Sequence, residues 1–361
     1  MTEPSPTTAA TDRAQLRARV DKALAWFLAD RREWMAAVDD ALAPVADAVE
    51  AFVLRGGKRL RPAFGYWGYR GAGGADSDQV VTALAALEFL QASALIHDDL
   101  IDRSDTRRGE PSVHRRFAGR HRAEGWSGDP DGFGEAAAVL LGDLCLVWSD
   151  ELLHAGGIDP ATLSRARPVF DEMRTEVTIG QYLDVLTQVT GTTSVERAGK
   201  VARLKSAKYT VERPLLLGAA LAGAGPEVVA AYSAYGLPLG EAFQLRDDLL
   251  GVFGDPELTG KPAGDDLREG KRTYLIAAAR ETADAAGRRD LDRLLGAPDL
   301  DAAGIARLRA VIMASGAAER TERRIATLLD GALAAIDAAP IELEARAVLV
   351  ELAHAATHRG L

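Results

Sequence analysis

The run DQVVTALAALEFLQASALIH, from Asp78 to His97, constrains the fold of this chain more than any other feature. Most of its positions are apolar, and its Ala, Leu and Glu residues are strong helix formers. A helix that is apolar on most of its faces is stable only when neighbouring elements cover it on all sides. The run therefore predicts a buried helix inside a larger helical structure.

The remainder of the chain predicts further helices separated by glycine- and proline-rich turns. Ala, Leu, Arg and Glu dominate it, and residues 198–224 and 226–255 form two more apolar runs. Stretches such as GAGGADS and AGAGPE interrupt these runs. Alternating strand patterns, composition breaks and fixed-period repeats are absent from the sequence. We therefore expect one all-α domain over residues 13–361, a flexible tail over residues 1–12, and a mobile surface loop at 120–134.

Composition and charge restrict the classes of function open to this chain. The 361 residues are 47% hydrophobic, enough for a large core, and the net charge of −10 argues against nucleic acid as a partner. The single cysteine, Cys145, excludes an internal disulfide framework. We find no secretory signal and no apolar run of about 18 residues that indicates a membrane span. These features predict a soluble, cytoplasmic protein of enzyme size.

Three carboxylates follow the apolar run directly, in the motif DDLID. Asp98 and Asp102 are four residues apart, so on a helix they lie on one face, about 40° apart around the axis, with Asp99 to the side. Like charges this close repel one another, and a bound cation removes the conflict. Carboxylate oxygens without a nearby cysteine suit Mg²⁺ better than zinc. Taken alone, the motif is equally compatible with a solvated helix end.

A second acidic pair, Asp247 and Asp248, follows another apolar run. Asp255 comes eight residues after Asp247, on roughly the same face if the helix continues, and Lys261 and Lys271 come soon after. Each acidic motif is thus followed by basic residues. Carboxylates that hold metal ions, with lysine and arginine beside them, form the kind of site that binds a diphosphate.

A third cluster, RGGKRLRP, places Lys58, Arg59 and Arg61 beside two glycines. Glycine lets the backbone approach an anion closely, so these basic residues form a further candidate site for phosphate groups. The chain contains no GxxxxGK[ST] motif, which argues against a nucleotide-binding loop of that type.

In combination and in order, these motifs resemble those of the trans-isoprenyl diphosphate synthase (polyprenyl synthetase) family. The matching segments are GGKRLRP, DDLID with RRG after it, GQYLD, KSAKYT and FQLRDD…GKP…GDDLREGKRT. They extend from about Leu54 to Thr273, and the chain looks most like a bacterial geranylgeranyl diphosphate synthase. The resemblance implies a single helical bundle around a central apolar cavity, a homodimer, and three Mg²⁺ ions in each active site.

Members of this family condense isopentenyl diphosphate with an allylic diphosphate, and the resemblance implies a role for each matching residue. Asp98 and Asp102 hold Mg²⁺ on the allylic diphosphate with support from Asp99, and Asp247 holds a further ion with Asp248 nearby. The remaining matches are Arg107, Lys205, Ser206, Gln244 and Lys261 at the allylic diphosphate, Lys271 as a more distant basic group, and Lys58, Arg61, Gln91 and Arg108 in the metal-free pocket for isopentenyl diphosphate. The catalytic groups expected are Asp98, Asp102, Asp247, Lys205 and Arg107. A surface cation at Arg108 and a buried structural amide at Gln91 are the alternatives.

Two positions depart from the family pattern. Many members carry a third aspartate four residues after the first in the second acidic motif, where this chain has Gly251. Asp255 lies further on, and whether it compensates for Gly251 stays open at this point. Ser206 replaces the threonine that commonly follows Lys205 and keeps its hydroxyl group.

Two other classes of function share part of this pattern. A class I terpene cyclase ionises the same substrates, but many cyclases carry a second metal motif that begins with asparagine, and this chain contains no asparagine. A cyclase also has little use for GGKRLRP and RRG. A non-catalytic subunit of a heteromeric synthase would be expected to lose metal carboxylates, and both acidic motifs are intact here.

Product length is expected to depend on the residues that precede Asp98. Family members that stop at farnesyl diphosphate commonly place a bulky aromatic four or five residues before the first aspartate, or insert two residues in the motif. Here those positions hold Ala94 and Ser93, so the pocket is expected to be open at that depth, with Leu90 or Leu87 as the next obstruction. We therefore expect mainly geranylgeranyl diphosphate, with farnesyl or longer polyprenyl diphosphates as alternatives.

Overall fold

The computed structural model describes residues 6–191, 194–255 and 264–357, and the side chains from residue 14 onward. Its described part is helical apart from one short hairpin, which confirms the all-α prediction. In chain order the elements are α1 (Pro6–Val38), the 3₁₀-helix η1 (Asp40–Leu42), α2 (Ala43–Leu54), α3 (Leu60–Gly71), α4 (Asp78–Ile101), β1 (Thr106–Arg107), β2 (Glu110–Pro111), α5 (Val113–Ala123), α6 (Pro130–Ala155), α7 (Pro160–Thr190), α8 (Val195–Ala202), the π-helix η2 (Arg203–Glu212), α9 (Arg213–Ala222), α10 (Pro226–Phe253), α12 (Asp265–Arg268), α13 (Tyr274–Thr282), α14 (Ala285–Leu294), α15 (Ala302–Ala314), α16 (Ala317–Asp337) and α17 (Leu343–Thr357).

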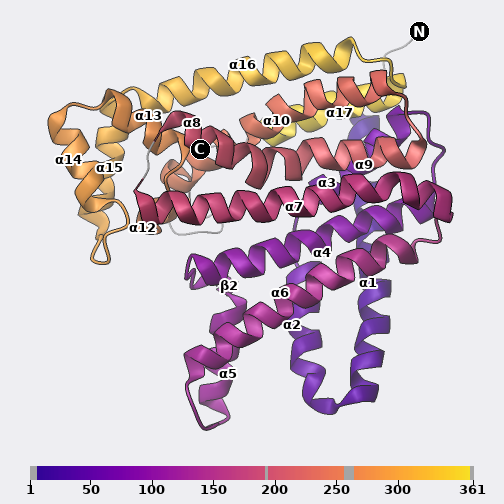
Figure 1. Ribbon diagram of the computed structural model, residues 1–361, viewed down its shortest axis with the longest axis horizontal. Coiled ribbons are helices and arrows are strands. Elements are labelled where there is room, and N and C mark those ends of the chain that lie inside the picture. Colours follow the sequence, from indigo (N-terminus) through magenta and orange to yellow (C-terminus); the bar gives the residue numbers. More distant parts are fainter. Residues whose placement is uncertain (1–5, 192–193, 256–263, 358–361) are drawn as a thin grey trace.

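Helix α4 lies inside the bundle, as its apolar sequence predicts (Figure 1). Ser77 caps its N-terminus by accepting a hydrogen bond from the backbone N–H of Val80, and the residues from Ala83 to Leu87 are fully buried. Contrary to our expectation, α4 is long and apolar enough to cross a bilayer by length and composition. However, 72% of its most apolar 18-residue stretch is buried inside the protein, so its apolar side chains form part of the core.

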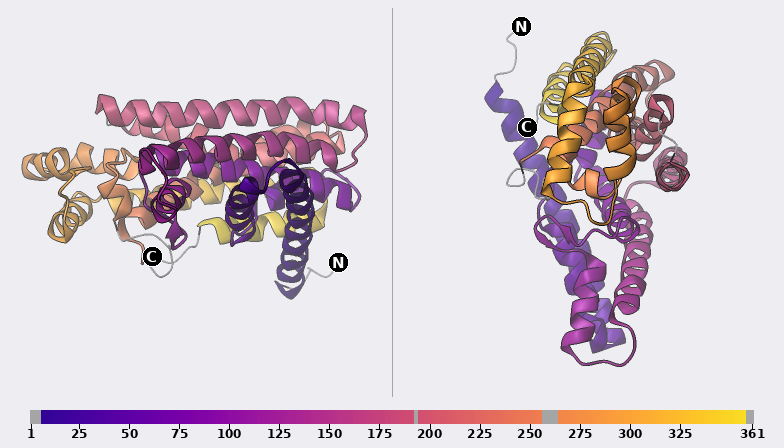
Figure 2. Two further views of the ribbon diagram at one scale, coloured as in Figure 1. Left: turned by 90° about the horizontal axis from the view of Figure 1, so that it is seen from below. Right: turned by 90° about the vertical axis from the view of Figure 1, so that its left-hand side faces the viewer.

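Helices α4, α7, α10 and α16 run roughly along the long axis of the molecule in Figure 1, whereas α1 runs across it. Helix α4 packs on α6 and α1, α10 packs on α16 and η2, and α3 packs on α9. Helices α1 and α2 form an antiparallel pair that projects from one side, with α5 projecting next to it (Figures 1 and 2). Helices α14 and α15 form a separate pair at one end, packed against α13 and α16. The bundle therefore places the C-terminal ends of α4 and α10 close to the same interior space.

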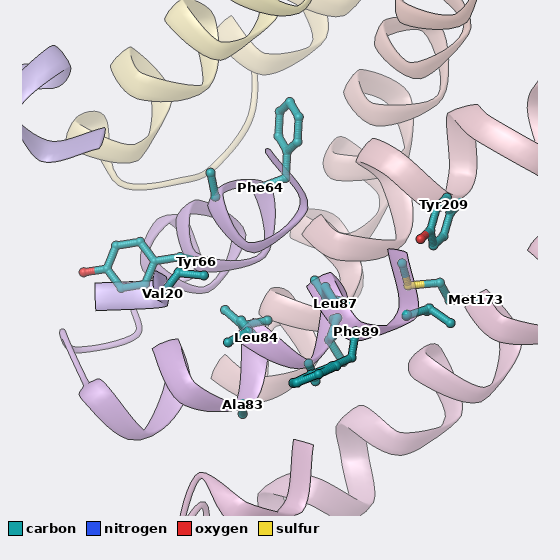
Figure 3. Close-up of a cluster of buried hydrophobic side chains, with 14 of the residues drawn as sticks. Val20, Phe64, Tyr66, Ala83, Leu84, Leu87, Phe89, Met173 and Tyr209 are labelled. Carbon is teal, nitrogen blue, oxygen red and sulfur yellow. The ribbon is translucent and has the colours of Figure 1, made fainter. Parts of the chain in front are cut away.

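Large side chains from helices that are distant in sequence fill the core beside α4. The rings of Phe27 in α1, Phe89 in α4 and Trp148 in α6 contact one another edge to face, with centroids 5.3 to 6.0 Å apart. Figure 3 shows Leu87 of α4 and Met173 of α7 in the same buried cluster. Each aromatic pair of this kind contributes about 0.5–1.5 kcal/mol beyond its buried area. These contacts fix α4 between α1, α6 and α7.

Two boundaries differ from those expected from the sequence. Helix α1 begins at Pro6, inside the segment 1–12 that was predicted as a tail. Helices α5 and α6 extend into the predicted loop 120–134 from both sides. The linker between them is packed, because the Trp126 ring contacts the rings of His121 and Phe133 at 5.9 and 5.4 Å. The glycines and prolines of this region suggested a loop, but these aromatic contacts hold it against the helices.

Candidate active site

One large cavity of about 1860 Å³ lies between α4, α7, η2 and α10. Side chains of all three motif clusters line it: Asp98 from the first acidic motif, Asp247 and Asp248 from the second, and Lys58 and Arg61 from GGKRLRP. These segments are far apart in the sequence and meet only in the folded chain. Apolar and small side chains form the apolar wall of the cavity, among them Leu90, Ser93, Ala94, Leu146 and Val177.

Asp98 is the centre of a hydrogen-bond network at the C-terminal end of α4. Its Oδ1 accepts hydrogen bonds from Lys205 Nζ and from Gln181 Nε2, both at 3.0 Å. Lys205 also donates to Asp184 Oδ2 at 2.7 Å. Burial raises the pKa of Asp98, but the charges of Lys205, Lys271 and Arg107 outweigh it, so the pKa lies below its ordinary value. Asp98 is therefore ionised and faces the cavity.

Asp99 and Arg107 form a buried pair beside this network. Asp99 is 1% exposed and accepts hydrogen bonds from Arg107 Nε at 2.9 and 3.1 Å, and Arg107 Nη2 lies 3.9 Å from Asp98 Oδ2. Arg107 lines the cavity from β1. Asp99 therefore holds the Arg107 guanidinium in position next to the carboxylate of Asp98.

Asp102 terminates α4 and lies in a second cluster of opposite charges. Lys271 Nζ is 3.1 Å from Asp102 Oδ2 and 2.6 Å from Glu269 Oε2. Ser104 Oγ donates to Glu269 Oε1 at 2.8 Å, which joins the segment after α4 to the end of α12. Burial raises the pKa of Asp102 to about 6, and the nearby Asp98 adds to this, although Lys271 acts in the opposite direction. The sequence suggested Lys271 as a distant basic group, and the structure places it between these carboxylates.

The second acidic motif lies on the last turns of α10. Asp247 lines the cavity, while Asp248 is 3% exposed and accepts a hydrogen bond from Gln244 Nε2 at 2.8 Å. Burial raises the pKa of Asp248 to about 8. Gly251 also lines the cavity, one turn beyond Asp247, whereas Asp255 is exposed beyond the end of the helix.

A carboxylate from another segment stands next to Gly251. A Cβ atom built on Gly251 would lie only 2.0 Å from Oδ2 of Asp266, which is the second residue of α12. Asp266 lines the cavity together with Asp247. Asp266 therefore stands where a side chain at position 251 would begin, whereas Asp255 does not line the cavity.

The basic residues of the GGKRLRP segment lie on one wall of the cavity. Arg61 Nη2 donates to Thr210 Oγ1 at 2.8 Å, and its guanidinium lies 4.3 Å from the centre of the Tyr209 ring. Tyr209 donates in turn to Gln91 Oε1 at 2.8 Å. Arg108 Nη1 donates to the carbonyl of Arg55 at 2.8 Å. Lys58, Arg61, Gln91 and Arg108 thus line one side of the cavity, as the resemblance implies for a second diphosphate pocket.

A π-helix carries the motif KSAKYT into this cavity. In η2 the residues Lys205, Ser206 and Tyr209 all line the cavity, and such wide turns are frequent at functional sites. Two glycines permit the neighbouring helices to approach it. A Cβ on Gly180 of α7 would lie 2.5 Å from the backbone nitrogen of Lys205, and one on Gly240 of α10 would lie 2.5 Å from the carbonyl oxygen of Ala207. The glycine of GQYLD is therefore needed for this close packing.

Three site residues were not assigned from the sequence. Gln181 and Asp184 contact Asp98 and Lys205, and their motif GQYLD was recognised without a role for either. Asp266 stands beside Gly251, and the signal for it was the unassigned acidic pair of GDDLREGKRT. Lys261, which was expected at the allylic diphosphate, lies outside the described residues.

The carboxylates of the site do not converge on a single point by themselves. Within the described ranges, no three His, Cys, Asp or Glu side chains are arranged as a group that could hold a metal ion alone. Lysine and arginine side chains stand between the acidic groups instead. Asp102 Oδ2 is buried and accepts no hydrogen bond despite its closeness to Lys271, so this oxygen retains capacity for a cation. The donor set, oxygen atoms on facing helices, fits Mg²⁺ that is shared with a phosphate ligand.

Comparison with known proteins agrees with this geometry. The model of the family described as "Polyprenyl synthetase" matches residues 43–312. The chain is 34% identical over 276 residues to geranylfarnesyl diphosphate synthase of Aeropyrum pernix, a match that covers 75% of this chain and 80% of that protein. It is 34% identical over 253 residues to geranylgeranyl diphosphate synthase of Methanosarcina mazei, with 68% and 72% covered.

A solved structure shows the same fold over nearly all of the chain. Geranylgeranyl pyrophosphate synthase of Corynebacterium glutamicum, solved in complex with isoprenyl diphosphate and magnesium, superposes with a TM-score of 0.92 at 43% sequence identity. The match covers 96% of this chain and 99% of that chain. The family match spans most of the chain, includes GGKRLRP and both acidic motifs, and therefore identifies this chain as a member of the polyprenyl synthetase family.

Proposed function

We propose that this chain is a Mg²⁺-dependent trans-prenyltransferase that condenses isopentenyl diphosphate with an allylic diphosphate to give mainly geranylgeranyl diphosphate. One observation carries the proposal: a single cavity joins two acidic motifs, a separate basic wall and an apolar wall. The primer would be dimethylallyl, geranyl or farnesyl diphosphate, all of which share an allylic diphosphate and an apolar tail. The relatives that act on such substrates support this assignment.

The charged end of the cavity suits cleavage of the allylic carbon–oxygen bond. Negative charge develops on the departing diphosphate, and Lys205 and Arg107 are held where they can stabilise it. Gln244 and Ser206 line the same region and offer polar contacts. The double bond of isopentenyl diphosphate then attacks the allylic cation, and the proton lost in this step passes to the diphosphate. No histidine base is required by this scheme.

The metal would be held by Asp98 and Asp102 on α4 and by Asp247 on α10, with Asp99 and Asp248 behind them. Mg²⁺, proposed here as three ions, would supply positive charge to the diphosphate that leaves. Asp98 and Asp247 face the cavity from two different helices, which fits ions that bridge protein and phosphate oxygens. When cations bind to these carboxylates, Lys271 would lose part of its contact with Asp102.

The second substrate would bind at the basic wall. Lys58, Arg61 and Arg108 carry positive charge there, and Gln91 is fixed by its hydrogen bond from Tyr209. Isopentenyl diphosphate would bind these groups without metal, because they supply positive charge themselves. This division would place the two reacting carbons between the two diphosphates.

The apolar wall supports geranylgeranyl diphosphate as the main product. Ser93 and Ala94 both line the cavity, so the described helix α4 carries no bulky side chain at the depth where farnesyl synthases commonly have one. Leu90 lines the cavity one turn deeper, while Leu87 is fully buried in the core behind it. Leu90 is therefore our proposed first obstruction on α4.

A homodimer in the cytoplasm would complete the proposed enzyme. Leu140 and Val147 on α6 and Ile179 and Tyr182 on α7 are 65, 61, 50 and 66% exposed, and the latter two also line the cavity. A second copy that covers these residues would shield a growing apolar tail from water. Light scattering coupled to gel filtration measures the oligomeric state. A monomer at micromolar concentration would contradict the proposed dimer.

The function is tested by incubating the protein with labelled isopentenyl diphosphate, an allylic primer and Mg²⁺. Chromatography of the dephosphorylated products should show mainly geranylgeraniol. A cyclic hydrocarbon formed without incorporation of label would indicate a terpene cyclase, and the absence of any product would indicate a non-catalytic subunit. A product mainly of farnesol or of longer alcohols would keep the reaction class and overturn the chain length.

A further inference from the structure

Arg59 is the one basic residue of GGKRLRP whose guanidinium is turned into the protein interior. Its side chain is 3% exposed, and each of its three nitrogens has a partner. Nε donates to Asp21 Oδ1 at 2.8 Å, Nη1 donates to Glu88 Oε2 at 2.6 Å, and Nη2 donates to the carbonyl of Val53 at 2.9 Å. This arrangement ties three helices, α1, α2 and α4, to the segment that begins α3.

The backbone of this segment has a conformation that requires support. Arg59 has φ of 50° and ψ of 38°, in the left-handed region that residues with a Cβ atom rarely adopt. Gly56 and Gly57 before it also have positive φ. A Cβ on Gly57 would lie 3.2 Å from Arg59 Nη1 and 3.8 Å from Glu88 Oε2, so the segment is folded tightly over this ion pair. The hydrogen bonds of the Arg59 side chain offset the cost of this conformation.

The residues on either side of Arg59 are those of the basic wall. Lys58 precedes it, Arg61 follows in the first turn of α3, and all three line the cavity. Glu88 lies three residues before Gln91 on α4, so one helix supplies both the anchor of Arg59 and the amide of the basic wall. The position of the Arg59 backbone thus determines where its neighbours present their charges.

We propose that the network Asp21–Arg59–Glu88 is a positioning device for the metal-free isopentenyl diphosphate pocket, and that Arg59 itself does not bind the diphosphate. This inference rests on the proposed function. It departs from the sequence-based grouping of Arg59 with Lys58 and Arg61, because each side-chain nitrogen of Arg59 donates a hydrogen bond to a protein acceptor. Glu88 is the critical partner, since it is 8% exposed whereas Asp21 is 40% exposed.

The substitution Glu88→Gln tests this proposal because two explanations predict opposite results. Removal of a negative charge near the pocket would tighten diphosphate binding if Glu88 acted only through its electric field. Loss of the anchor would instead let the segment 56–59 move and would weaken binding. We expect the Michaelis constant for isopentenyl diphosphate to rise about tenfold, while that for the primer and the turnover number at saturation change less than about twofold.

A direct binding measurement separates this effect from catalysis. Isothermal titration calorimetry of isopentenyl diphosphate into the protein with EDTA present measures binding to the metal-free pocket alone. Glu88→Gln should raise this dissociation constant by the same factor as the Michaelis constant. Arg59→Lys, which keeps one charge but cannot reach all three acceptors, should give an intermediate increase. Glu88→Asp provides the same test if Glu88→Gln does not fold, because it keeps the charge and withdraws it from Arg59.

A matched ion pair elsewhere on α1 provides the control. Glu50 accepts hydrogen bonds from Arg32 Nε at 3.0 Å and Nη2 at 2.7 Å, joins α1 to α2, and lies away from the cavity lining. Glu50→Gln should leave both Michaelis constants unchanged. An unchanged or lower constant for isopentenyl diphosphate in Glu88→Gln, or an equal rise for both substrates, would overturn the proposal. A wild-type protein that elongates no primer would instead overturn the proposed function, since that result does not depend on any variant.

Discussion

The carboxylate of Asp266 occupies the space where a side chain at Gly251 would begin: a Cβ there would lie 2.0 Å from Asp266 Oδ2. Asp266 belongs to α12, a different helix from the one that carries Gly251. Its Oδ1 atom lies 3.7 Å from Lys271 Nζ. A side chain at position 251 would therefore require the Asp266 carboxylate, the far end of a flexible side chain, to move. Asp266 lines the cavity together with Asp247 but belongs to a different helix.

This overlap predicts a reciprocal result from two substitutions. Gly251→Asp alone should lower turnover, because it forces the Asp266 side chain to move and sets two carboxylates side by side. Asp266→Ala alone should lower turnover by about tenfold or more, since an acidic group beside the proposed metal site is lost. The double variant should recover most of the turnover, measured by steady-state kinetics. Asp255→Ala is the control and should behave as wild type. A double variant no better than Asp266→Ala would show that the two positions are not equivalent.

Activity should require a divalent cation, and Asp98 and Asp247 should contribute most to it. Asp98→Ala or Asp247→Ala should reduce turnover by about a hundredfold or more, with smaller changes in the Michaelis constants, because the cations act on charge that develops in the transition state. Asp255→Ala should have little effect. Mg²⁺ should support turnover better than Ca²⁺. Full turnover in excess EDTA, measured by incorporation of labelled isopentenyl diphosphate, would refute the metal assignment.

Mutation of the basic wall should weaken binding of one diphosphate substrate and not of the other. Lys58→Ala and Arg108→Ala should each raise the Michaelis constant for isopentenyl diphosphate by about tenfold, because each removes a charged contact to that substrate. The constant for the allylic primer should change much less. Initial rates with one substrate varied and the other saturating give both values. If either variant weakens only primer binding, the division of the cavity into two pockets is wrong.

Product length should respond to the size of the side chain at Ser93. Ser93→Phe places an aromatic ring in the cavity one turn above Leu90, so chain growth should stop at farnesyl diphosphate while condensation continues. Ser93→Ala is the matched control, since it leaves the cavity open and should keep the wild-type product. Chromatography of the dephosphorylated products measures the shift. An unchanged product from Ser93→Phe would place the limit on another helix.

Cys145 should be unreactive in the folded protein. Its side chain is fully buried in α6, and burial raises the pKa of its thiol to about 12, so almost no thiolate is present at pH 8. A thiol reagent such as 5,5′-dithiobis(2-nitrobenzoic acid) should modify it only as fast as the protein unfolds. Rapid labelling of the native protein at pH 8 would contradict this placement, and labelling in denaturant is the positive control.

The amino-acid pattern alone indicates the fold class, the family and most of the charged residues that line the cavity. Helix formation depends on local propensity and on apolar periodicity, and both are readable along the chain, as the run that became α4 shows. The first acidic motif is equally local, because Asp98 and Asp102 share a face through the spacing of one helix. Family motifs then indicated which distant segments belong to one site.

The contacts between those segments become visible in the folded chain alone. Arg59 and Arg61 are two residues apart and look alike in sequence, yet one guanidinium is buried against Asp21 and Glu88 while the other lies on Tyr209. Asp266 replaces a side chain at Gly251 through a contact between two elements. The direction of a long side chain depends on its backbone dihedrals and on the charges that other helices bring near it. Those charges come from residues far away in the chain, so no local pattern contains them.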